Sequence, residues 1–159
     1  MLKLIRFNLC KSAEWEHFYN LFAAYLAEVC DEEEYQENMD DLHNEALNRQ
    51  MIEQTLQTHN PYFVMRIVLN EECVGLISYS YDEEHHLGFV NNFFVRSEHR
   101  NVGIGVAAYR MVENHLINLG ANRIELIPVG KAQQFYVRNG FTPSRTTVDG
   151  EQVYCKPIT

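Results

Sequence analysis

A strand, a glycine-rich loop and a helix are predicted in succession over residues 87–119, and no other stretch constrains the fold as strongly. Residues 87–95 read LGFVNNFFV, and such a run of β-branched and aromatic side chains is typical of a buried strand. Residues 106–119 carry apolar side chains at helical spacing, and Gly120 stands where a C-terminal cap is expected. The loop between them contains the hexapeptide RNVGIG at 100–105.

This loop is suited to binding an anion. The first N–H groups of a helix lack partners and carry the positive end of the helix dipole. Gly103 and Gly105 let an anion approach the backbone without meeting a Cβ atom. Arg100 adds a guanidinium group that can bind phosphate oxygens as a fork. The loop therefore predicts a site for a phosphate or a pyrophosphate.

Two motifs resemble a known family. The Arg-x-x-Gly-x-Gly pattern at 100–105, which follows a strand ending in Val95 and opens a helix, resembles the acetyl-CoA signature of the GNAT superfamily of N-acetyltransferases. Downstream, residues 132–141 read AQQFYVRNGF, which is similar to the final helix of that family. A predicted strand at 123–129 separates the two motifs. The resemblance is good over residues 76–141 and holds only in outline for the first 60.

The resemblance implies an α+β fold in which helices flank a mixed, mostly antiparallel central sheet, formed by a single domain over residues 1–159. The sequence pattern agrees with this expectation. It predicts strands at 2–7, 62–69, 74–81, 87–95, 123–129, 142–148 and 151–157, and helices at 12–29, 41–58, 106–119 and 131–139. Eight acidic residues between 28 and 41, with no Lys or Arg among them, favour a solvated connection or an acidic rim that attracts amines.

The resemblance also implies where acetyl-CoA binds. Backbone groups of residues 93–95 would hold the pantetheine arm as if it were an added strand. Residues 100–105 would hold the pyrophosphate. The expected cofactor-binding residues are Phe93, Phe94, Val95, Arg100, Asn101, Val102, Gly103, Ile104 and Gly105.

Two residues are candidates for catalysis. Tyr136 matches the tyrosine that commonly protonates the leaving thiolate in this family. Glu125 lies near the position where some members carry a catalytic glutamate, although an exposed strand carboxylate is the simpler interpretation. Two differences weaken the match to the family. Asn91 and Asn92 occupy positions where members often carry an acidic residue, and Val129 occupies a position where many carry an asparagine.

Two other functions remain open. Residues 103–108 also fit G-x-G-x-x-A, and Glu125 lies about 20 residues further on, as in an NAD-dependent oxidoreductase. Against this, seven residues separate Val95 from Gly103, whereas a dinucleotide loop follows its strand directly. A non-catalytic acyl-CoA-binding module is the second alternative, favoured by the missing acid at 91 and 92.

Net charge and cysteine spacing limit the partners. A net charge of -9 argues against nucleic acid and is compatible with a cationic acceptor. No apolar run approaches the roughly 20 residues of a membrane span, no signal peptide is recognised, and the four scattered cysteines suggest no metal site. These features favour a cytoplasmic protein. The resemblance implies an enzyme, and by family habit a homodimer, that transfers an acetyl group from acetyl-CoA directly to a primary amine of a small molecule or peptide.

Overall fold

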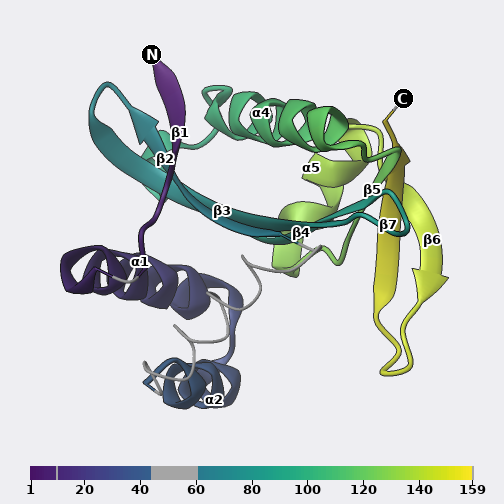
Figure 1. The fold of residues 1–159 in the computed structure, drawn as a ribbon. Helices are drawn as coiled ribbons and strands as arrows, with labels where there is room; N and C mark the ends of the chain where they lie inside the picture. The colour runs from purple at the N-terminus through teal and green to yellow at the C-terminus, as the bar shows by residue number, and fades with distance from the viewer. Residues whose placement is uncertain (10, 44–60, 159) are drawn as a thin grey trace.

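The computed structural model describes residues 1–9, 11–43 and 61–158 (Figure 1). Seven strands are present in this part of the chain: β1 (Leu2–Arg6), β2 (Tyr62–Leu69), β3 (Glu72–Asp82), β4 (Leu87–Val95), β5 (Arg123–Leu126), β6 (Thr142–Thr146) and β7 (Gln152–Pro157). Four α-helices accompany them: α1 (Ser12–Val29), α2 (Glu32–His43), α4 (Ile104–Leu119) and α5 (Gln133–Arg138). Two short 3-10 helices, η1 (Ser97–His99) and η2 (Gly130–Ala132), precede α4 and α5.

The strands form one sheet in the order β1-β2-β3-β4-β5-β7-β6. Only β4 and β5 are parallel neighbours, and α4 makes the connection between them. All other neighbouring strands run antiparallel. The predicted mixed, mostly antiparallel sheet flanked by helices is confirmed. A dinucleotide-binding fold needs repeated parallel βαβ units, so the fold does not support the oxidoreductase alternative.

Each face of the sheet packs against its own helices. Helix α4 lies on one face, where Tyr109 and Val112 join a core that also contains Tyr136 of α5. Helix α1 lies on the other face, where its aromatic stripe, including Trp15 and Tyr25, is buried in a second core (Figure 1). The alternation of side chains along each strand therefore divides the apolar residues between two layers.

A β-bulge in β4 shapes the centre of the molecule. Ser78 lies opposite Asn92 and Tyr79 lies opposite Val90, which leaves Asn91 as the extra residue of β4. The parallel pairing with β5 ends at Val90 and does not resume. Beyond the bulge, β4 continues beside β3 alone, and its other edge has no strand partner among the described residues. An opening between β4 and β5 results.

The acidic stretch differs from the expectation. Most of it forms α2, a helix with three glutamates in its first turn, instead of a loop connection. Carboxylates near a helix N-terminus interact favourably with the helix dipole, which accounts for helix formation in so acidic a segment. The helix expected at 41–58 lies outside the described residues except for its first three positions.

Gly75 on β3 sets how closely β4 can approach. A Cβ atom built on Gly75 would lie 2.1 Å from the carbonyl oxygen of Phe94, so the backbone of β4 would have to move. We expect Gly75→Ala to lower the free energy of unfolding by about 1–3 kcal/mol, the usual effect of overpacking. Urea unfolding measures the change. Gly105→Ala is the control, because its Cβ would meet only ordinary contacts of 3.5 Å or more; equal stability of the two variants would contradict the prediction.

Candidate active site

A cavity of about 1110 Å³ opens where β4 and β5 separate. Its walls come from the free edge of β4, the loop before α4, the segment leading into α5, and the C-terminal end of α1. Seven of the nine residues predicted to bind the cofactor line it: Phe93, Phe94, Val95, Arg100, Asn101, Gly103 and Gly105. Val102 is instead an exposed residue, and the side chain of Ile104 is buried in the core.

The loop before α4 presents the start of that helix to the cavity. Gly103 is the N-cap residue, with a left-handed φ of 87°, and no side chain caps the helix. Asn101 also has a positive φ, of 62°, which asparagine tolerates better than most residues. With no capping side chain, the first N–H groups of α4 are free of side-chain acceptors and can bind an anion.

Arg100 holds this loop to two other elements. Its Nε atom donates a hydrogen bond of 2.7 Å to the carbonyl oxygen of Val95. Its two terminal nitrogens donate to the two carboxylate oxygens of Glu28 on α1, with Nη2 at 2.6 Å. The guanidinium carbon also lies 5.5 Å from the ring centroid of Phe94. The predicted phosphate fork of Arg100 is therefore engaged with a carboxylate in this structure.

Positive charge gathers around the cavity although the chain as a whole is acidic. Arg100, Lys131 and Arg138 line it, against the single carboxylate of Glu28. The sequence reasoning did not single out Lys131 or Arg138. A signal was present, because residues 126–148 contain no Asp or Glu in a chain of net charge -9. The local field therefore favours an anionic ligand.

Tyr136 on α5 lines the cavity with 6% of its surface exposed. Its ring packs against Phe135 and Phe141, with centroids 5.2 and 5.6 Å away. Burial raises the pKa of Tyr136 well above its ordinary value, and the nearby Tyr25 raises it further. The phenol is therefore protonated at neutral pH and is able to donate a proton or a hydrogen bond.

Glu125 does not line this cavity. Its neighbours in β5, Ile124 and Leu126, belong to the core on the α4 side, so Glu125 faces the other side of the sheet. There its carboxylate accepts a hydrogen bond of 2.9 Å from Nη2 of Arg145 on β6. The Glu125 side chain is 8% exposed, whereas that of Arg145 is 56% exposed. The two predicted catalytic residues, Glu125 and Tyr136, thus lie on different sides of the sheet.

Comparison with known proteins places the chain in a family. A sequence profile of the acetyltransferase (GNAT) family matches residues 15–141. The chain belongs to the GNAT family of acetyltransferases. No curated protein sequence matches the chain significantly.

Several solved structures share this fold. The PaiA N-acetyltransferase of Thermoplasma acidophilum, in complex with coenzyme A, superposes with a TM-score of 0.76 at 12% identity, covering 99% of each chain. Tetrahymena GCN5 superposes at 0.70 with 13% identity, covering 99% of this chain and 96% of that one. An aminoglycoside 6'-N-acetyltransferase complexed with coenzyme A superposes at 0.67 with 13% identity, covering 99% and 97%. At these identities the likeness shows the fold alone.

Two of the three departures from the GNAT pattern lie in the cavity wall. Asn91, the bulge residue, lines the cavity, and Asn92 donates a hydrogen bond of 3.0 Å from Nδ2 to Oγ of Ser78. Neither amide can accept a proton from an amine. Val129 also lines the cavity and offers no side-chain hydrogen bond. Tyr25, from the end of α1, adds an aromatic side chain to the cavity wall.

Two further features concern metals and membranes. Among the described residues, no group of three or more His, Cys, Asp or Glu side chains is arranged to hold a metal ion. None of the helices in the described part of the chain has the length and apolar character needed to cross a membrane.

Proposed function

We propose that this GNAT protein transfers an acetyl group from acetyl-CoA directly to a primary amine of a small, cationic acceptor. The observation that carries the proposal is that cationic side chains predominate at the cavity although the chain as a whole is acidic. Three cationic side chains and an uncapped helix N-terminus gather there in a chain of net charge -9. A ligand with several phosphate groups and a long uncharged arm matches this distribution of charge.

The cofactor would bind in two parts. The pyrophosphate would accept hydrogen bonds from the first N–H groups of α4, with Lys131 and Arg138 nearby in the cavity wall. Arg100 would join them by exchanging its Glu28 partner for a phosphate. The pantetheine arm would pair with the free edge of β4 at Phe93–Val95, as an added strand does.

The chemical step would need few side chains. The amine nitrogen attacks the thioester carbonyl carbon, so that a C–N bond forms and the C–S bond breaks. A backbone N–H of β4 would stabilise the oxyanion that forms on the way. Tyr136 would give its proton to the departing thiolate. An acceptor that arrives as an ammonium group loses one proton to become the attacking neutral amine and a second proton once the C–N bond has formed. Tyr136 regains a proton from solvent, and the products are an amide and free CoA.

The base that takes the proton of the amine is proposed to be Glu125, acting through a water molecule because its carboxylate does not line the cavity. The Glu125 carboxylate is buried and covered by the largely exposed Arg145, so an arriving ammonium group can take the place of that guanidinium. A cationic acceptor would then be guided to the one carboxylate that its amine needs. An acceptor of this kind also suits the net negative charge of the protein.

Calorimetric titration with acetyl-CoA, with NAD as the control ligand, tests the cofactor. Binding of acetyl-CoA alone supports the proposal, and thiol release in the presence of polyamines, aminoglycosides or peptide amines then tests the acceptor. Binding without turnover on any amine would favour the non-catalytic acyl-CoA-binding module. Cytoplasmic location and a homodimeric state stay predictions from the sequence.

Replacing the proposed base should slow transfer without affecting the cofactor. We expect Glu125→Gln to lower kcat/KM for the amine about 100-fold, at the low end of general acid–base effects, with unchanged affinity for acetyl-CoA. Steady-state kinetics at saturating acetyl-CoA measure the effect. Glu151→Gln, in the exposed turn before β7, removes the same charge and is the control. Full activity of Glu125→Gln would mean that the amine reacts without this carboxylate.

A further inference from the structure

Tyr109 on α4 carries a buried hydroxyl group that makes no hydrogen bond of normal geometry, although the Glu113 carboxylate lies near it. The residue is 1% exposed. In the described part of the chain, its hydroxyl oxygen is the one buried side-chain polar atom that meets the geometric criteria for a hydrogen bond with no partner. A buried donor that makes no hydrogen bond destabilises the folded state, and Phe would fill the same space without that cost. The hydroxyl group of Tyr109 is therefore expected to add little to the stability of the fold.

The surroundings of Tyr109 keep this hydroxyl protonated. Burial raises the pKa of Tyr109 most; a hydrogen-bonding interaction with the Glu113 carboxylate comes next, and the charges of Glu113 and Tyr136 raise it further. Glu113 is bound at 2.9 Å by Nζ of Lys156 on β7, and that nitrogen lies 5.5 Å from the centroid of the Tyr109 ring. The group that faces the core is therefore a neutral phenol, able to donate one hydrogen bond.

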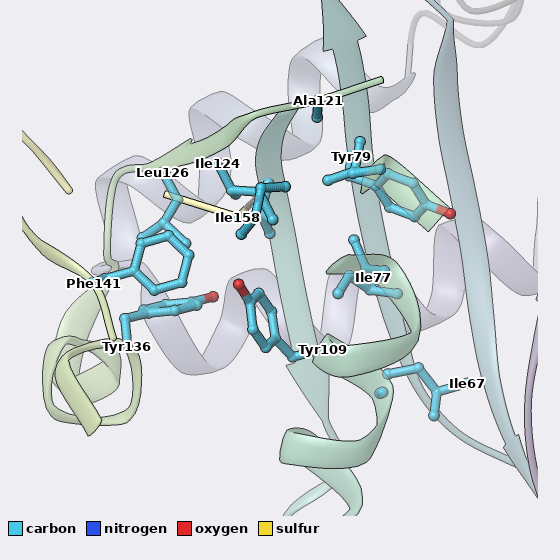
Figure 2. Close-up of a cluster of buried hydrophobic side chains, with 14 of the residues drawn as sticks. Ile67, Ile77, Tyr79, Tyr109, Ala121, Ile124, Leu126, Tyr136, Phe141 and Ile158 are labelled. Atoms are coloured by element: carbon cyan, nitrogen blue, oxygen red, sulfur yellow. The ribbon is translucent and has the colours of Figure 1, made fainter. Parts of the chain in front are cut away.

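The hydroxyl of Tyr109 is directed at the proposed acid. Figure 2 shows the hydroxyl groups of Tyr109 and Tyr136 pointing toward each other within the core on the α4 side. Both rings contact Phe141, with centroid distances of 5.7 and 5.6 Å. The two phenols make no hydrogen bond to each other. Tyr109 is thus a donor that is directed at Tyr136 but not hydrogen-bonded to it while Tyr136 is neutral.

We infer that Tyr109 is a positioning residue that stabilises negative charge on Tyr136 during acetyl transfer; the inference rests on the proposed function. When Tyr136 gives its proton to the CoA thiolate, its O–H bond breaks, an S–H bond forms, and a phenolate appears in a buried site. Tyr109 then donates a hydrogen bond to that phenolate and keeps its own proton. An interaction made only as charge develops lowers the barrier of the step.

This role also answers a difficulty in the proposed mechanism. Burial that raises the pKa of Tyr136 keeps the phenol protonated but makes it a weaker acid. A hydrogen bond donated to the charged form of an acid favours that form. Tyr109 therefore restores acid strength to Tyr136 at the moment of transfer, without ionising it in the resting protein.

Tyr109→Phe tests the inference by its effects on both activity and stability. We expect kcat to fall about tenfold with an unchanged KM for acetyl-CoA, while Tm stays the same or rises by about 2–4 °C. Tyr79→Phe is the matched control, because this tyrosine is equally buried in the same core but its hydroxyl bonds Nδ1 of His115 at 2.7 Å. Its Tm should fall by about 2–4 °C and its kcat should not change.

The Tyr136→Phe background separates this inference from the proposed function. With no hydroxyl at 136, adding Tyr109→Phe should cause no further loss of kcat, because no phenolate is left to stabilise. Independent, multiplying losses would overturn the inference. The inference would also be overturned if Tyr109→Phe kept full kcat while Tyr136→Phe was slow. In that case the role of Tyr136 as the acid would stand. Full kcat in Tyr136→Phe would overturn the acid role and the inference together.

Discussion

Tyr136→Phe is expected to lower kcat for acetyl transfer about 1000-fold, while the affinity for acetyl-CoA stays within a few-fold of the original. The substitution removes one oxygen atom from a ring that is held on both sides by Phe135 and Phe141, so the cavity keeps its shape. The leaving thiolate then has no positioned proton donor. Thiol release measures kcat, and calorimetry measures the dissociation constant of acetyl-CoA.

The Tyr79→Phe variant serves as the control for Tyr136→Phe as well. Tyr79 is a buried tyrosine of the same core that does not line the cavity, so loss of its hydroxyl should leave kcat unchanged. Equal losses of turnover and of acetyl-CoA affinity in Tyr136→Phe would show that the phenol shapes the cavity and is not the acid.

Gly105→Val should abolish measurable binding of acetyl-CoA in a protein that remains folded. Gly105 lies in the first turn of α4, and a Cβ built there would be 3.5 Å from the ring of Phe135 and 3.9 Å from that of Phe93. A single methyl group therefore fits. The two further methyl groups of valine would extend into the cavity beside the N–H groups proposed to bind the pyrophosphate.

Gly105→Ala is the matched control for this prediction. Alanine should keep acetyl-CoA binding and raise the free energy of unfolding by about 0.5–1 kcal/mol, because glycine is a poor helix former. Calorimetry and urea unfolding, applied to both variants, separate loss of the site from loss of the fold. An unchanged affinity in folded Gly105→Val would refute the assignment of the loop to the pyrophosphate.

Local sequence determined the unit on which this protein is built. The apolar and aromatic run of β4, the helical spacing of α4 and the glycine at 103 each act over a few residues, so their conformations could be predicted without knowledge of the fold. Gly103 indeed has the left-handed φ that favours glycine. The same holds for Tyr136, because the motif around it specifies a short helix that ends at a glycine.

Only the tertiary structure decided which side chains meet. Arg100 is bound by Glu28, 72 residues away, and Glu125 by Arg145, 20 residues away, and neither pairing has a periodicity that a sequence could show. The direction of Glu125 away from the cavity follows from the side of β5 on which α4 packs. The cavity itself exists because one extra residue in β4, Asn91, ends the pairing with β5. Long-range packing and strand register, which depend on the whole chain at once, thus determine the geometry of the site.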